Sequence, residues 1–441
     1  MTKLRGVDVD AYMNGEMLLH FRNITVTQRC SESPIVFFGP GHVYLDKRSL
    51  KFVLYHACVS DEMGRHMAVS FGGQAGELIE ETSLFNFDGV DVTGNQWTAE
   101  GVDASGGNYS AEFCVVQGSI DFLTSKRGLS GNSNNSLHQM YFEHPCFPSP
   151  PFSGIAPELE FVCGESSVSL SKGKPACDVA VRGGELSDEF AKAVEKTLNV
   201  LSGVRLQLGV AEKIWADHHV VELYSMDTEL SNQPLVPPIE IPVQSPSEFY
   251  GNIFSHLVNF FQQNGSVYYD NWYKLNRAWQ AGLESAALNV SVCIEGVLKA
   301  YFLPLGSDKE FAELCQHAVP VIMQLEVSDR VRNLLRSCLG GSGHFKPKTA
   351  LRALTDSGEI SNELAGKWNK LRSETAHAVV AGEAREDWQR MVDLTFANIK
   401  LFYEILFSIV GYAGERIDYE VRGFPSKLPS VKKTAPDQTE G

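Results

Sequence analysis

The chain has 441 residues, with 54 Asp and Glu against 38 Lys and Arg and a formal net charge of −16. At about 100–200 residues per domain this length suggests two to four domains. A composition of 43% hydrophobic and 21% charged residues excludes a mostly disordered chain.

Every apolar stretch of about 18 residues is interrupted by charge, so we expect no membrane-spanning helix. The first residues lack the apolar run of a secretory signal, and the nine cysteines include no Cys-x-x-Cys pair. These features favour a reduced, cytoplasmic protein.

Residues 1–150 have the pattern of a β-rich domain. Short apolar and β-branched runs at 50–56, 113–116 and 120–123 are separated by loops rich in Gly, Asn and Ser. Short strands with turn signals between them predict a sandwich or a barrel-like fold. A proline-rich break at 145–151 then ends this domain.

A small mixed α/β domain is expected over residues 151–233. A helix starting near Ser187 and ending near Leu201 is followed by strand-like runs at 204–208 and 220–224. Five prolines between Pro234 and Pro246 then predict a linker or an extended crossing over 234–246.

Residues 247–422 show helical periodicity. Ser245, Pro246 and Glu248 have the order of a helix start, with an N-cap, a proline at the first helical position and an acid three residues after the cap. Apolar residues then recur in steps of three and four through 283–301, 364–378 and 388–409. Three or more amphipathic helices with one apolar stripe each predict an all-α bundle. The expected fold class is α+β multidomain, with a disordered tail over 423–441.

The charge is distributed unevenly between the two halves. Residues 1–248 hold 17 Lys and Arg against 32 Asp and Glu, a net of −15. Residues 330–400 hold 12 against 8, a net of +4. An acidic surface disfavours nucleic-acid binding, so any such binding is expected in this locally basic stretch.

The basic stretch contains Arg372 followed five residues later by His377, which is the only Arg-x4–6-His in the chain. A histidine near its ordinary pKa can take the proton of a ribose 2′-hydroxyl or protonate a leaving 5′-oxygen. An arginine can hold the scissile phosphate and stabilise its transition-state charge. The pair therefore suits RNA cleavage that needs no metal or cofactor.

In a regular helix these two residues differ by about 140° around the axis and would not converge on one phosphate. Either the helix is distorted here, or the motifs of two copies meet across a dimer. The alternative is a surface Arg with a helix-terminal His that interacts with the helix C-terminus.

The segment from Arg372 to His377, set in a C-terminal helical bundle, resembles the R-x4–6-H motif of the HEPN superfamily. The upstream helix, with its segment 294–299, supports the likeness, and the β-rich first half is similar in architecture to ApeA-type HEPN nucleases of bacterial anti-phage defence. The resemblance implies a metal-independent endoribonuclease with Arg372 and His377 as catalytic residues. It also implies a homodimer, or a higher homo-oligomer, whose paired motifs line one cleft. Ser373 keeps a polar side chain at a position where members often carry Asn, Asp or His.

Three further residues are possible auxiliaries beside Ser373. Glu295 and Lys299 are four residues apart and could orient the catalytic groups or contact phosphate, or they could form an ordinary surface ion pair. Glu374 could tune the pKa of His377 or be solvated.

One group of residues could be considered as a metal site. Its spacing matches no common zinc pattern, so we expect no metal site there. The group consists of His138, His144, Cys146 and Cys163.

Two functions are compatible with these patterns. In the first, the chain is an anti-phage ribonuclease that cleaves tRNA or other RNA after its N-terminal domains sense a trigger, for example a phage protein. In the second, it is a non-catalytic binding or scaffold protein whose helical bundle only dimerises.

Overall fold

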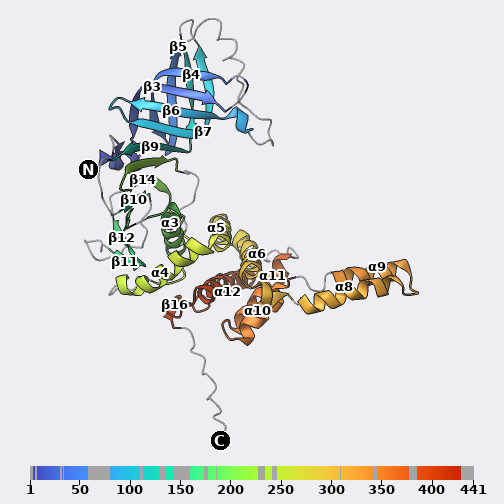
Figure 1. Cartoon of the computed structure of the whole chain (residues 1–441). Coiled ribbons are helices and arrows are strands. Elements are labelled where there is room, and N and C mark those ends of the chain that lie inside the picture. The colour runs from blue at the N-terminus through green and yellow to red at the C-terminus, as the bar shows by residue number, and fades with distance from the viewer. Residues whose placement is uncertain are drawn as a thin grey trace. The chain divides into compact units, whose positions relative to one another are not determined.

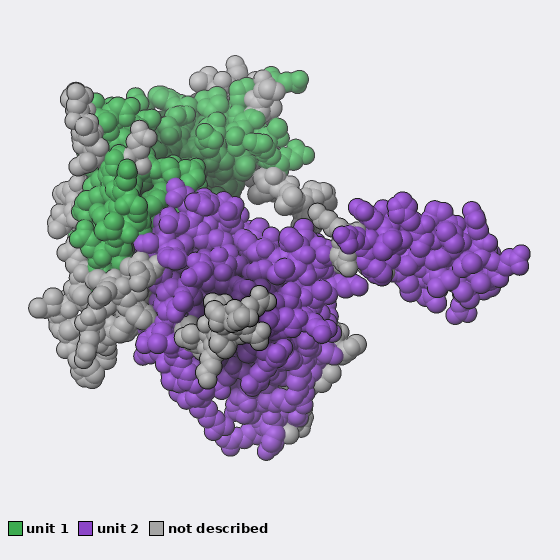
Figure 2. Space-filling view, turned by 60° about the horizontal axis from the view of Figure 1, so that its bottom comes forward, with its two compact units in different colours: residues 1–195, 206–231, 246–251 green, residues 196–205, 232–245, 252–441 purple. Residues whose placement is uncertain are grey.

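The computed structural model describes residues 3–4, 7–29, 32, 34–57, 80–109, 113–129, 136–143, 159–172, 177–184, 186–226, 234–240, 246–307, 309–340, 345–376 and 385–428. The chain divides into two compact units, coloured separately in Figure 2. Unit 1 comprises residues 1–195, 206–231 and 246–251, and unit 2 comprises residues 196–205, 232–245 and 252–441.

Unit 1 contains a six-stranded closed barrel, which confirms the β-rich N-terminal region. The strands pair antiparallel in the order β6-β3-β4-β5-β8-β7, and pairing of β7 with β6 closes the ring. Buried and exposed residues alternate along β3 and β6, because successive side chains of a strand point to opposite faces. The rings of Phe21, Phe52 and Phe87 pack edge to face in the interior. The strand bounds are Leu18–Gln28 (β3), Val36–Asp46 (β4), Ser49–Ala57 (β5), Phe85–Asp91 (β6), Gln96–Tyr109 (β7) and Phe113–Ile120 (β8).

The remaining long strands form a sheet in the order β11-β12-β13-β10-β14-β15-β9, which is joined to the barrel by one pairing between β7 and β9. Strands β9 and β10 precede residue 150, yet they pair with β15 and with β13 and β14. The boundary expected at residue 150 therefore does not separate the two sheets, because strand pairing joins segments distant in sequence. The bounds are Phe122–Gly128 (β9), Ser136–Phe142 (β10), Leu159–Cys163 (β11), Ser166–Lys172 (β12), Cys177–Gly183 (β13), Leu208–Ile214 (β14) and His218–Tyr224 (β15).

Short elements and one helix complete the first half of the chain. Strands Lys3–Leu4 (β1) and Val7–Asp8 (β2) pair antiparallel and precede helix α1, Val9–Met13, and a 3-10 turn covers Glu81–Ser83. Helix α3 spans Asp188–Ser202, close to the helix expected from sequence. Cys177 is disulfide-bonded. This differs from the expectation of a reduced chain.

The second half is helical, as the periodicity predicted, and its core elements are α6, α11 and α12 (Figure 1). These three helices contact one another through the expected stripes, which bury Ile294, Trp368 and Phe402. Ser245 lies outside the described residues, and α4 begins at Pro246. No helix within the described ranges has the length and apolar character needed to cross a membrane. The helix bounds are Pro246–Gln263 (α4), Ser266–Gln280 (α5), Leu283–Tyr301 (α6), Leu303–Gly306 (α7), Lys309–Met323 (α8), Asp329–Gly340 (α9), Pro347–Asp356 (α10), Asn362–Ala376 (α11) and Arg385–Val410 (α12).

The described part of the proline-rich segment, residues 234–240, is packed rather than solvated. Leu235 and Ile239 are fully buried. The Tyr403 hydroxyl donates to the carbonyl of Val236 at 2.9 Å, and the amide of Ile417 donates to the carbonyl of Pro238 at 3.3 Å. Proline lacks a backbone donor but keeps its carbonyl, so this segment accepts hydrogen bonds from α12 and from the strand after it.

The expected disordered tail begins with ordered residues. Strand β16, Arg416–Ile417, pairs with β17, Ser426–Lys427, and the Phe424 ring stacks on Phe396 of α12 with centroids 5.0 Å apart. Phe424 and its neighbours therefore belong to the packed unit, whereas residues 429–441 lie outside the described residues.

Candidate active site

Helix α11 places Arg372 at the edge of the helical core. The helix is capped at its start, where the amide of Leu364 donates to the hydroxyl of Ser361 at 3.1 Å. Trp368 and Leu371 are buried, because they lie on the apolar stripe of α11. Arg372 follows directly after Leu371, and its side chain is 44% exposed. The stripe thus fixes the helix while leaving the guanidinium accessible to a ligand.

The Arg372 guanidinium is held by residues of two helices. Its Nε donates to a carboxylate oxygen of Glu295, which comes from α6, 77 positions earlier in the chain. Its central carbon lies 5.8 Å from the centroid of the Trp368 ring. Within the described ranges, the two terminal nitrogens of Arg372 donate no hydrogen bond. Glu295 and Trp368 therefore orient the guanidinium of Arg372. No described residue occupies its two terminal nitrogens, which are available for a bidentate contact with an anion.

The ion-pair partner of Glu295 differs from the one that the sequence spacing suggested. Among the side chains that the structure describes, the ion-pair partner of Glu295 is Arg372 and not Lys299. Lys299 is exposed in the last turn of α6. The sequence alone did not single out Trp368 as a partner of Arg372, although their spacing of four residues places them on one helix face.

Glu374 is paired rather than solvated. Its carboxylate binds the guanidinium of Arg390 in the first two turns of α12. This pair ties the end of α11 to the start of α12, and no local pattern could have predicted it, because its members are 16 positions apart. Ser373 is exposed.

His377 lies outside the described residues, as do residues 378–384. Helix α11 is regular to Ala376, the residue immediately before it. The approach of His377 to Arg372 therefore stays a prediction.

An apolar strip lies on α6 next to Glu295. Leu288 and Val292 precede Glu295 by seven and three positions and are among the exposed large apolar residues. Residues with this spacing share one face of a helix. The exposed face of α6 thus combines apolar side chains with the carboxylate that holds Arg372.

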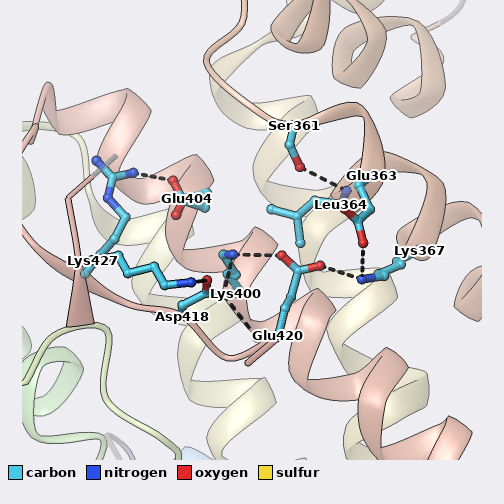
Figure 3. Close-up of polar contacts among 10 residues, drawn as sticks. Ser361, Glu363, Leu364, Lys367, Lys400, Glu404, Asp418, Glu420 and Lys427 are labelled. Atoms are coloured by element: carbon cyan, nitrogen blue, oxygen red, sulfur yellow. Dashed lines mark hydrogen bonds and ion pairs between the residues drawn. The ribbon is translucent and has the colours of Figure 1, made fainter. Parts of the chain in front are cut away.

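A network of lysines and acids supports α11 and α12 from the segment that follows them (Figure 3). Lys400 of α12 contacts Asp418 at 2.6 Å and Glu420 at 2.7 Å, and Lys367 of α11 contacts Glu420 at 2.6 Å. Burial would raise the pKa of Asp418, but hydrogen bonds from Lys400 and Lys427 hold it at about 2. The network has its charges matched within the protein, so we assign it a structural role.

The weaker metal candidates are partly described. His138 is fully buried and packs edge to face on Trp215, with ring centroids 5.0 Å apart. Burial lowers its pKa to about 4, and the charge of Lys213 adds to the effect. His144 and Cys146 lie outside the described residues. In the part of the chain that is described, no group of three His, Cys, Asp or Glu residues is placed to hold a metal ion.

Comparisons of the chain with known protein families, with curated proteins and with solved structures find no match.

Proposed function

We propose that this chain is a HEPN-type endoribonuclease with Arg372 and His377 as its catalytic residues. The observation that carries the proposal is the Arg372 guanidinium, which is half-exposed and oriented by Glu295 and Trp368 while its terminal nitrogens lack protein partners among the described residues. Such a guanidinium is prepared to bind a phosphate without first having to be ordered.

The chemistry follows from the two side chains. His377 takes the proton of the ribose 2′-hydroxyl, and the 2′-oxygen attacks the adjacent phosphorus. The bond from phosphorus to the 5′-oxygen breaks, and a histidinium returns a proton to that oxygen. Arg372 stabilises the charge on the phosphate oxygens in the transition state. The products are a 2′,3′-cyclic phosphate end and a 5′-hydroxyl end.

In a regular helix Arg372 and His377 are about 140° apart around the axis, so one copy of the motif does not bring both to the same phosphate. A second copy of the chain would solve this, because the motifs of the two copies could face each other. The apolar strip of Leu288 and Val292 supports this arrangement, because it offers surface for a partner beside Glu295. Two motifs that face each other would supply one histidine as base and the other as acid. The RNA, with tRNA as the first candidate, would then lie along this face. The acidic N-terminal half would carry the sensor for a trigger such as a phage protein.

The test is end-resolved RNA sequencing of cells that express wild type or His377→Ala, with and without phage challenge. We expect new 5′-hydroxyl ends that depend on His377 and on Arg372. Arg352→Ala is the matched control, since it removes an exposed, ion-paired arginine of α10. Unchanged ends with His377→Ala and Arg372→Ala would remove the nuclease assignment and leave a binding or scaffold protein.

A graded series tests the role of Glu295. Glu295→Gln keeps a hydrogen-bond acceptor for Arg372, whereas Glu295→Ala removes it. We expect cleavage to decrease more in Glu295→Ala than in Glu295→Gln, and less in either than in Arg372→Ala. Equal cleavage by wild type and Glu295→Ala would show that this contact does not position Arg372.

A further inference from the structure

The helices α8 and α9 form an antiparallel hairpin that buries few of its own side chains (Figure 1). Of the described side chains between Glu310 and Leu339, only Cys315 is buried. The helices have 15 and 12 residues, and isolated helices of about that length are marginal in water. The hairpin therefore needs a further surface against which its apolar residues can pack.

The exposed apolar residues of this hairpin follow the spacing of a helix-packing seam. On α8, Phe311, Leu314 and Val321 are exposed, and Ala318 completes steps of three, four and three. On α9, Val331, Leu334 and Cys338 repeat steps of three and four, and Leu335 lies beside them. Leu314 and Leu334 are the most exposed of these, at 66% and 63%. This period favours a helical partner, because side chains spaced in this way interlock with those of another helix.

The charges of the hairpin are complementary to each other. Helix α8 carries one Lys and two Glu, a net of −1, and helix α9 carries one Asp and three Arg, a net of +2. Glu310 and Glu313 are exposed on α8, and Arg330 and Arg336 are exposed on α9. In a two-fold arrangement, α8 of one copy faces α9 of the other, so that each acidic helix meets a basic one.

We propose that the α8–α9 hairpin is a self-association surface and that the same hairpin of a second copy of this chain packs on it as a four-helix bundle. The apolar period favours a helical partner, and the complementary charges of α8 and α9 favour a second copy of this chain as that partner. This surface is separate from the Leu288 and Val292 strip, and the inference does not depend on the nuclease activity.

A charge-swap experiment on the full chain tests the proposal. The first variant carries Glu310→Arg and Glu313→Arg, so that both helices are basic. The second carries Arg330→Glu and Arg336→Glu, so that both are acidic. We expect each variant alone to self-associate at least about tenfold more weakly than wild type in sedimentation velocity, and a mixture of the two to regain association. Association of each variant equal to that of wild type, or a mixture no tighter than its components, would overturn the proposal.

The apolar seam is tested with Leu314→Glu and Leu334→Glu in one chain. The control has Val92→Glu and Leu428→Glu, which change two exposed apolar residues outside the hairpin and add the same charge. We expect the variant with Leu314→Glu and Leu334→Glu to self-associate more weakly than wild type in sedimentation velocity. The control variant should self-associate as strongly as wild type. Repeating the charge swap with Leu288→Glu and Val292→Glu present isolates the hairpin contact from the α6 face. A wild-type chain that is monomeric at every concentration up to its solubility limit would refute self-association.

Discussion

Replacing Arg372 by alanine should separate function from stability. The side chain is 44% exposed, and its partner Glu295 is also partly exposed. An exposed ion pair contributes about 0.2–1 kcal/mol, and the contact with the Trp368 ring adds about 0.5–1 kcal/mol. We therefore expect Arg372→Ala to lower the free energy of unfolding by no more than about 2 kcal/mol.

The same substitution should have a larger effect on cleavage. Removing one preorganised donor to a charged transition state commonly costs about 10²–10³ in kcat, which is about 3–4 kcal/mol. The assay compares urea unfolding with single-turnover cleavage of an RNA identified by end-resolved sequencing, using Arg352→Ala as the control. A loss of stability well above 2 kcal/mol would make Arg372 a structural residue. Full cleavage by a folded Arg372→Ala would contradict the catalytic assignment.

Two further predictions concern stability. The pKa of Asp418 is held at about 2, below its unfolded value near 3.9, so Asp418 stabilises the fold above about pH 4 and that contribution is lost as the pH falls toward 2. Urea midpoints measured across this range should fall more steeply for wild type than for Asp418→Asn, and parallel slopes would argue against the role of the network. In the barrel, the buried carboxylate of Asp91 accepts hydrogen bonds from Trp97 Nε1 at 3.1 Å and from the Asn95 amide at 2.9 Å. Asp91→Ala should lower the free energy of unfolding by about 3 kcal/mol, because Trp97 Nε1 loses its acceptor in the interior; a change below about 1 kcal/mol in thermal or urea unfolding would contradict this.

Periodicity was sufficient to locate several elements. The apolar steps through 283–301 and 388–409 correspond to α6 and α12, and the barrel was one of two architectures expected for the first half. These signals are local, because the period of a helix or strand is set by the geometry of its own backbone. The sequence also singled out Arg372 and Glu295 separately, by residue type and spacing.

Only the tertiary structure paired Arg372 with Glu295, assigned β9 and β10 to the second sheet, and showed that residues 234–240 are packed. Each of these contacts joins positions far apart along the chain. Nothing in the local pattern determines such a pairing, because it depends on how the apolar faces of whole helices and strands are buried together. The sequence by itself determined which residues can form elements and carry charge, and packing decided which of them meet.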